Sequence, residues 1–220
     1  MHLNKYIDHT LLKATATTSD IVKLCQEAIT NDFFSVCVNS CYVSLAAEQL
    51  KHSNVKVCSV IGFPLGAMST LAKAAEATEA LKSGANEIDM VMNLGFLKSK
   101  YFDSVWKDIQ AVKAVMPNNT LKVILETCYL SNEEILKASE LAIKGGADFI
   151  KTSTGFGTRG ASIEDVKLMK RIAKDSTKIK ASGGIKDAKT AIEYINLGAE
   201  RLGTSSGIAI IKGKTSNSSY

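Results

Sequence analysis

Short apolar runs alternate with longer amphipathic segments along the whole chain. Eight of these runs have the length of a β-strand, and the segments between them carry apolar residues at the spacing of an α-helix. We therefore expect helices to alternate with strands at 5–8, 34–39, 55–61, 87–92, 121–126, 148–153, 177–182 and 200–204. The first of these runs gives the weakest strand signal.

A weak internal repeat supports this alternation. Gly84, Gly146 and Gly198 each follow a helix-like segment, and each precedes an alanine and a new apolar run. Glycine suits this place because the residue that ends a helix often adopts a positive φ angle. The intervals of 62 and 52 residues leave room for one further strand–helix unit between successive glycines.

Eight strands that alternate with helices in 220 residues predict an α/β protein with a single (β/α)8 barrel, the TIM barrel fold. We expect the barrel to occupy residues 1–211 and a polar C-terminal tail to occupy 212–220. A doubly wound open sheet is the alternative, but its usual Gly-x-Gly-x-x-Gly pattern does not follow the first strand.

The composition narrows the class of protein. No apolar run reaches the roughly 18 residues of a membrane span, and the N-terminus has no apolar core of signal-peptide length, so no membrane partner is expected. The five cysteines include no Cys-x-x-Cys pair and are interpreted as reduced thiols of a cytoplasmic protein. Basic residues spread along the chain produce the net charge of +5, which does not favour a nucleic-acid partner. The three histidines have no metal-ligand spacing, so neither a metal nor another cofactor is expected.

In four of the predicted strands, 87–92, 121–126, 148–153 and 177–182, charged residues alternate with apolar ones. Alternate side chains of a strand face opposite sides of the sheet, and the outer face of a barrel strand must be apolar to pack on helices. The charged set should therefore point into the barrel; it consists of Asp89, Lys122, Glu126, Lys151 and Lys180. Buried charges are costly unless they are paired or functional, so an internal ion-pair layer is the alternative to an active site. We expect Lys122 and Glu126 to form such an internal pair.

Two lysines that face one cavity indicate carbonyl chemistry. Almost every free lysine is an ammonium group at neutral pH, but a second ammonium about 5 Å away disfavours the charged form by roughly 3 kcal/mol at an effective dielectric near 20. A neutral amine can attack a carbonyl carbon and form a Schiff base. Asp89 could supply or relay the protons, so Lys151, Lys180 and Asp89 are candidates for metal-free catalysis through an imine.

The ends of the last two predicted strands offer donors for an anion. Gly183 and Gly184 follow one strand, and Ser205 and Ser206 follow the next. Glycine lets backbone N–H groups approach an anion, and serine adds hydroxyl donors. In (β/α)8 barrels a phosphate site often forms from the loops after strands 7 and 8. Each segment alone is also typical of an ordinary turn, but together they favour a phosphorylated substrate.

Several longer motifs resemble those of the deoxyribose-phosphate aldolases. The segment FIKTSTGF at 149–156 is very similar to the motif that carries the Schiff-base lysine in that family. Further matching motifs follow the order of the family and lie at 6–12, 35–39, 60–66, 87–93 and 180–184. The resemblance covers nearly the whole chain and implies a class I aldolase with a (β/α)8 fold.

This resemblance implies reversible cleavage of 2-deoxy-D-ribose 5-phosphate to D-glyceraldehyde 3-phosphate and acetaldehyde. The expected partners are therefore a small phosphorylated sugar and acetaldehyde, and a homodimer is plausible for the family. By motif match, Lys151 would form the imine with the acetaldehyde unit, and Lys180 would favour its neutral amine. Asp89 would be the acid/base partner, and Asp8 in the first motif is a candidate for the proton relay.

The phosphate contacts of the family would fall on the residues that end the last two strands. They are Gly183, Gly184, Ser205 and Ser206, with Gly155 nearby. No metal takes part in the reaction of this family, which agrees with the lack of clustered histidines.

Some positions depart from the family pattern. Some members carry a lysine where this chain has Phe156, so Arg159 is a candidate to replace that phosphate contact; a solvated loop arginine is the alternative. Many members have proline where this chain has Ala14 and Ser40. The absence of these proline rings is expected to loosen two loops of this chain. Some members end in a tyrosine that folds back to the active site, so Tyr220 is a candidate for the relay, with a disordered terminus as the alternative.

Two other functions stay open at this stage. Another Schiff-base barrel, such as a transaldolase or a keto-acid aldolase, would use similar lysines, but the long motifs argue against it. A barrel that binds a phosphosugar without turning it over would have no need of a neutral amine at Lys151. A metal-dependent aldolase is disfavoured because no histidines cluster in the sequence.

Overall fold

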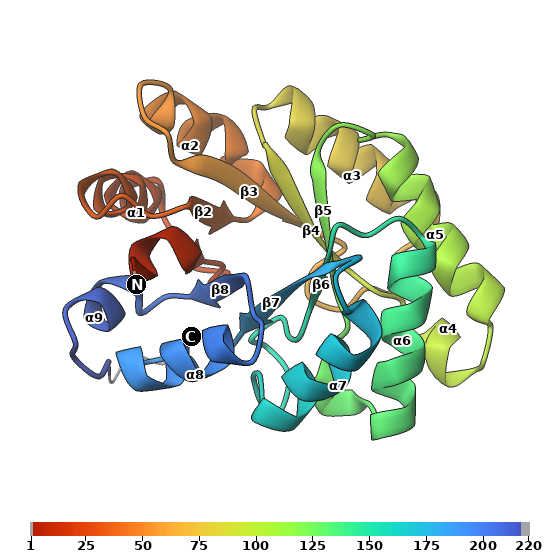
Figure 1. The fold of residues 1–220 in the computed structure, drawn as a ribbon. Coiled ribbons are helices and arrows are strands. Elements are labelled where there is room, and N and C mark those ends of the chain that lie inside the picture. The colour runs from red at the N-terminus through yellow and green to blue at the C-terminus, as the bar shows by residue number, and fades with distance from the viewer. Residues whose placement is uncertain (1, 217–220) are drawn as a thin grey trace.

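Eight parallel strands close into one barrel in the computed structural model, which describes residues 2–216 (Figure 1). Each strand pairs with its neighbours in sequence order, and β8 pairs with β1 to complete the ring. The strands are β1 (Ile7–Leu11), β2 (Ser35–Val38), β3 (Lys56–Ile61), β4 (Glu87–Val91), β5 (Thr120–Ile124), β6 (Phe149–Lys151), β7 (Lys178–Ser182) and β8 (Arg201–Thr204). The predicted (β/α)8 fold is confirmed, and the open doubly wound sheet is excluded.

Helices connect the strands and cover the outside of the barrel (Figure 1). The α-helices are α1 (Thr18–Thr30), α2 (Val43–Leu50), α3 (Thr70–Lys82), α4 (Leu94–Lys98), α5 (Phe102–Ala114), α6 (Asn132–Lys144), α7 (Ile163–Ala173), α8 (Ala188–Asn196) and α9 (Gly207–Ile211). Three short 3-10 helices are η1 (Leu3–Tyr6), η2 (Ser40–Tyr42) and η3 (Thr127–Tyr129). Helix α9 packs against η1 beside the seam of β8 and β1. No helix within residues 2–216 is long and apolar enough to span a lipid bilayer.

The helix ends follow the local sequence signals. Gly84, Gly146 and Gly198 have φ angles of 108°, 91° and 102°, and each lies two residues beyond the end of a helix. At the start of α6, the Ser131 side chain accepts a hydrogen bond from the Glu134 N–H, and the Glu134 side chain accepts one from the Ser131 N–H. These features are predictable because each joins residues only a few positions apart.

All eight strands differ from their predicted ranges at one end or both, and β1, β5 and β6 differ most. β1 begins at Ile7 and runs to Leu11, because Lys5 and Tyr6 belong to η1 while residues 8–11 pair with β2. β5 ends at Ile124, and the residue at the predicted end, Glu126, adopts a left-handed φ of 50°. The alternation of side chains along β5 therefore does not extend to Glu126.

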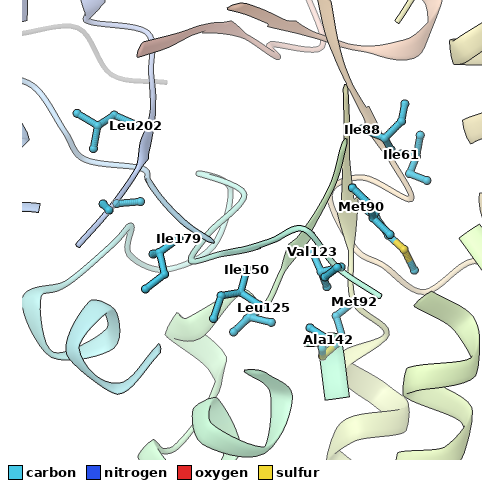
Figure 2. Packing of buried hydrophobic residues seen from close by; sticks show 14 of the residues in the cluster. Ile61, Ile88, Met90, Met92, Val123, Leu125, Ala142, Ile150, Ile179 and Leu202 are labelled. Atoms are coloured by element: carbon cyan, nitrogen blue, oxygen red, sulfur yellow. The ribbon is translucent and has the colours of Figure 1, made fainter. Parts of the chain in front are cut away.

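The strands present apolar side chains to the surrounding helices. Ile88, Met90, Val123, Ile150 and Ile179 lie in the main buried apolar cluster, together with residues of the covering helices (Figure 2). These are the positions that strand parity assigns to the outer face. The alternate positions of the same strands are left for the interior of the barrel.

A buried ion pair joins α3 to α5. Lys73 Nζ lies 2.7 Å from Asp108 Oδ2 and 3.1 Å from the carbonyl oxygen of Val91, and both charged side chains are at most 2% exposed. The Thr70 hydroxyl donates to Asp108 Oδ1 at 2.7 Å. Burial lowers the pKa of Lys73, and the attraction of Asp108 only partly offsets it. The pair therefore costs desolvation energy, but it satisfies both charges.

We expect Asp108→Ala to destabilise the fold by about 3–5 kcal/mol, because it leaves the ammonium of Lys73 buried without its counter-ion. The double variant Lys73→Met/Asp108→Leu should be at least as stable as the original chain, because no buried charge is left. Urea unfolding followed by the fluorescence of the single tryptophan, Trp106, measures both effects. A wild-type unfolding midpoint for Asp108→Ala would contradict the expectation.

Candidate active site

Asp89 lies in the middle of β4 and shares its carboxylate with three lysines inside the barrel. Lys122 Nζ lies 2.8 Å from Oδ1, and the Nζ atoms of Lys151 and Lys180 each lie 2.7 Å from Oδ2. The four residues come from consecutive strands, and register pairs Asp89 with Lys122 and Lys151 with Lys180. All four side chains are at most 3% exposed. Strand parity brings them together as the sequence predicts.

Asp8 on β1 is the second carboxylate of this cluster. Its Oδ2 lies 2.5 Å from Lys180 Nζ, so Lys180 bridges Asp8 and Asp89. Its Oδ1 accepts hydrogen bonds from the Ser35 hydroxyl at 2.6 Å and from Arg201 Nη1 at 2.7 Å. The structure thus brings Asp8 to the predicted catalytic residues.

Sequence analysis missed a further layer of charges next to this cluster. Glu87 Oε2 lies 2.7 Å from Lys122 Nζ and 3.1 Å from Arg201 Nη1, which also donates to Asp8. Gly203 shares the inner face of β8 with Arg201, and a Cβ at Gly203 would lie 3.0 Å from Lys180 Cε. The alternation of Arg201 and Gly203 in the last predicted strand was the available signal.

The charges of the cluster stabilise one another. Burial raises the pKa of Asp89, but the charges of Lys122, Lys151 and Lys180 outweigh burial and hold it well below its usual range. Burial lowers the pKa of Lys180, but Asp8 and Asp89 outweigh this effect and raise it above its usual range. Asp89 is therefore a carboxylate, and Lys180 an ammonium group, at neutral pH.

The expected ion pair between Lys122 and Glu126 is wrong. Lys122 binds Glu87 and Asp89 instead. Glu126 lies beyond the end of β5, where its Oε1 accepts from the Thr154 N–H at 3.1 Å and its Oε2 accepts from the Thr154 hydroxyl. Glu126 therefore joins the loops that follow β5 and β6 at the carboxyl end of the barrel.

Three glycines of the predicted phosphate site lie near this end. Gly183 and Gly184 follow β7 and both have positive φ angles, 82° and 78°. A Cβ at Gly183 would lie 2.8 Å from the Cα of Gly160 and 3.7 Å from the Cα of Gly155, so the loops after β6 and β7 touch here. Only glycine allows this contact, because any side chain at Gly183 would meet backbone.

The serines of the predicted phosphate site follow β8. The Thr204 hydroxyl donates to a backbone carbonyl in the loop after β7 at 2.7 Å, which ties the two loops together. The same hydroxyl accepts from the Ser206 N–H at 2.9 Å. Ser205 lines a cavity of about 420 Å³, whose charged lining residues are Lys13, Lys23, Asp20 and Glu27. The two lysines favour an anion at Ser205 and the two carboxylates oppose it, so a phosphate contact of Ser205 stays a prediction.

Three other sequence-based candidates have different outcomes. Arg159 lies in the loop after β6, where its side chain is 44% exposed and donates to both carboxylate oxygens of Asp165 on α7; its contact with phosphate stays a prediction. The ring of Phe156 meets that of Phe63 edge to face at 5.4 Å, across the loops after β6 and β3. Tyr220 lies outside the described residues.

Two of the five cysteines lie beside Asp89, which the sequence analysis did not predict. Cys37 and Cys58 are register partners on β2 and β3, and their sulfur atoms lie within 4.8 Å of each other and of the Asp89 carboxylate. Such donors can hold a metal ion. Here the Cys58 thiol donates to Asp89 at 3.0 Å, and Lys122 Nζ donates to Cys58 Sγ at 3.3 Å. An ammonium group thus supplies the positive charge at this place.

The carboxylates of the cluster should make the fold sensitive to acid. The pKa values of Asp8 and Asp89 are lower in the folded chain than the usual 3.8. Their stabilising contribution is therefore complete above about pH 5 and is lost as the pH falls below about 4. We expect the urea midpoint to change little between about pH 7 and 5 and to fall steeply below about pH 4. A constant midpoint down to about pH 3 would argue against buried, charge-paired carboxylates.

Comparison with known sequences gives one consistent result. The model of a family described as DeoC/LacD family aldolase matches residues 3–213. A deoxyribose-phosphate aldolase from Finegoldia magna is 59% identical over 213 residues, which are 97% of this chain and 100% of that protein. A protein of the same name from Carboxydothermus hydrogenoformans is 56% identical, and the match covers 97% of this chain and 96% of that protein.

Comparison with solved structures agrees. A tetrameric deoxyribose phosphate aldolase from Aeropyrum pernix superposes with a TM-score of 0.89 and is 33% identical, covering 96% of this chain and 89% of that one. An aldolase called QR15 has a TM-score of 0.92 and 47% identity, covering 96% of this chain and 94% of that one. Each likeness extends over nearly the whole chain.

Proposed function

Because the chain belongs to the deoxyribose-phosphate aldolases of the DeoC/LacD family, we propose that it reversibly cleaves 2-deoxy-D-ribose 5-phosphate to D-glyceraldehyde 3-phosphate and acetaldehyde. One observation carries this proposal: the Nζ atoms of Lys151 and Lys180 each lie 2.7 Å from the same oxygen of buried Asp89. The contact supports chemistry in which one amine reacts while its neighbour stays charged.

Lys151 is the nucleophile of the proposed reaction. Asp89 Oδ2 lies within hydrogen-bond distance of Lys151 Nζ and can accept a proton from it. The neutral amine attacks the aldehyde carbon, C1, and forms a carbinolamine. Asp89 returns the proton to the carbinolamine hydroxyl, and loss of water gives an iminium ion. Lys180 stays charged beside it and opposes the return of positive charge to the free amine.

The bond between C2 and C3 of the sugar then breaks. A base takes the proton of the C3 hydroxyl, the bonding electrons move to the iminium group, and glyceraldehyde 3-phosphate leaves an enamine on Lys151. The enamine takes a proton at C2, and water releases acetaldehyde and the free lysine. We assign these proton transfers to Asp89, with Lys180 and Asp8 as the relay, because contacts of 2.7 and 2.5 Å link the three groups.

The phosphate of the substrate is proposed to bind at the loops after β7 and β8. The residues are Gly183, Gly184, Ser205 and Ser206, with Gly155 beside them. The positive φ angles of the paired glycines, and the hydrogen bond that ties the two loops, support this assignment. Backbone N–H groups and hydroxyls bind phosphate without a metal.

A negative charge at Ser205 should therefore weaken binding of the phosphorylated sugar. We expect Ser205→Asp to raise the KM for 2-deoxyribose 5-phosphate at least about tenfold, because two like charges about 4 Å apart repel by several kcal/mol near a protein surface. Turnover of unphosphorylated 2-deoxyribose should change less than about twofold. Asn118→Asp, which adds the same charge at an exposed site just before β5, is the matched control. Equal KM values for the two variants would exclude Ser205 from the phosphate site.

The proposed activity is tested by incubating the purified protein with 2-deoxyribose 5-phosphate in the presence of EDTA. Acetaldehyde and glyceraldehyde 3-phosphate are then measured separately. Equal amounts of both products are expected, with no effect of the chelator. Binding of the sugar without release of acetaldehyde would favour a non-catalytic phosphosugar-binding barrel, and transfer of a three-carbon unit from fructose 6-phosphate would favour a transaldolase.

The chain is also proposed to associate with copies of itself. The family resemblance suggests a homodimer, and self-association is supported by the relative from Aeropyrum pernix, whose structure is described as tetrameric. Light scattering of the purified protein distinguishes a monomer, a dimer and a tetramer by mass.

The five cysteines are free thiols, which supports the proposal of a reducing, cytoplasmic location.

A further inference from the structure

The hydroxyl of Ser153 is buried and makes no hydrogen bond within the described residues. Its side chain is 0% exposed, and its Oγ has no hydrogen-bond partner among residues 2–216. Other buried serines of the barrel do have partners: the hydroxyl of Ser35 donates to Asp8 at 2.6 Å, and that of Ser182 donates to the Ser153 carbonyl at 2.6 Å. A buried polar group without a partner is rare and lowers stability. The position of Ser153 therefore calls for a functional reason.

Ser153 lies on the same side of the chain as Lys151. The backbone continues in an extended form beyond β6, because the Thr152 N–H donates to the Lys180 carbonyl at 3.1 Å and the Thr152 carbonyl accepts from Thr127 at 3.0 Å. Side chains two positions apart on such a backbone share a face. The hydroxyl of Ser153 thus follows Lys151 toward the carboxyl end of the barrel.

Ser153 also lies next to the proposed phosphate site. A Cβ built on Gly183 would be 3.8 Å from the Cβ of Ser153. The hydroxyls on either side of Ser153 are engaged: that of Thr152 donates to the Ser182 carbonyl, and that of Thr154 donates to Glu126. Between the proposed imine and the proposed phosphate contacts, Ser153 has the hydroxyl that lacks a protein partner within the described chain.

We propose that the Ser153 hydroxyl binds the sugar hydroxyl next to the phosphate-bearing carbon, the one retained in glyceraldehyde 3-phosphate. This inference rests on the proposed function, which places the aldehyde carbon at Lys151 and the phosphate near Gly183. The carbon chain between these two points passes Ser153. A serine hydroxyl can both donate and accept a hydrogen bond, so it matches an alcohol. Substrate binding then satisfies a polar group that the protein leaves unpaired.

The test compares two acceptor aldehydes in the synthetic direction, with acetaldehyde as the donor. One is glyceraldehyde 3-phosphate, and the other is 3-oxopropyl phosphate, which lacks only the hydroxyl. Ser153→Ala should lower kcat/KM for glyceraldehyde 3-phosphate roughly tenfold and change that for 3-oxopropyl phosphate less than about twofold. Its urea midpoint should not fall, because no protein hydrogen bond is lost. Ser139→Ala removes a buried hydroxyl that donates to the Ile135 carbonyl on α6, and it is the control with no expected selectivity between the aldehydes.

Borohydride trapping of acetaldehyde separates this inference from the proposed function, since acetaldehyde has no hydroxyl. Trapping at Lys151 should be equal in the original chain and in Ser153→Ala. Loss of trapping in the variant, or an equal loss of activity toward both aldehydes, would show that Ser153 positions the lysine and would overturn the inference. Full activity of the variant toward both aldehydes would overturn it as well. Failure of the original chain to trap acetaldehyde would refute the proposed function, and this inference with it.

Discussion

Lys151→Ala is expected to lower aldolase turnover by roughly 10⁴-fold or more, the size of the loss when a covalent nucleophile is removed. The barrel should stay folded, because Asp89 keeps its contacts with Lys122 and Lys180. The decisive measurement is reduction with borohydride in the presence of acetaldehyde, followed by digestion and mass spectrometry. In the original chain an ethyl group is expected on Lys151. In the variant, the peptide that contains position 151 should carry no ethyl group.

Lys178→Ala is the matched control for this experiment. Lys178 begins β7 and its side chain is 59% exposed, so removal of its amine should change neither turnover nor trapping. Labelling spread over many lysines of the original chain, or unchanged turnover in Lys151→Ala, would contradict the assignment of Lys151 as the nucleophile.

Lys180→Leu should lower turnover by about 10²- to 10⁴-fold, the range of a lost acid–base group. Lys180 is an ammonium group at neutral pH because Asp8 and Asp89 raise its pKa. Without this charge the interior of the barrel is less positive and protonated forms of the site are favoured, so the residual activity should have its optimum at a higher pH. Initial rates from about pH 6 to 10 give both the loss and the direction of the shift.

Lys180→Arg is the control that keeps the charge. Its optimum should not move to higher pH, although its geometry lowers turnover. Both variants should fold, since Asp8 keeps its hydrogen bonds from Ser35 and Arg201. A Lys180→Leu profile with an unchanged optimum would show that the charge of Lys180 does not control the reacting amine.

Strand parity predicted that Asp89, Lys122, Lys151 and Lys180 share the inner faces of β4 to β7, but it did not predict how deeply each position is buried, because Lys178, on the same face of β7, is 59% exposed. The apolar residues Ile88, Val123 and Ile150 pack on the helices, so the alternate positions must face inward (Figure 2). The same argument failed at Glu126, because parity holds only while the chain stays extended. A single left-handed residue ended β5 early and turned that carboxylate toward Thr154.

The partners of the charged residues were harder to predict than their positions. The expected pair of Lys122 and Glu126 joined residues four positions apart, whereas Lys122 binds a residue 33 positions away. Arg201 and Glu87 are 114 positions apart, and their contact depends on the arrangement of all eight strands. No local sequence pattern predicts a contact between residues so far apart along the chain.

The sequence by itself determined the alternation of strands and helices, the helix ends and the inward face of β4 to β7. These depend on backbone periodicity and on hydrogen bonds between residues a few positions apart. Only the tertiary structure decided which cation each carboxylate binds and which buried hydroxyl within residues 2–216 has no partner. The physical reason is closure of the barrel, which pairs β8 with β1 and brings Lys180 to Asp8 across 172 positions of the chain.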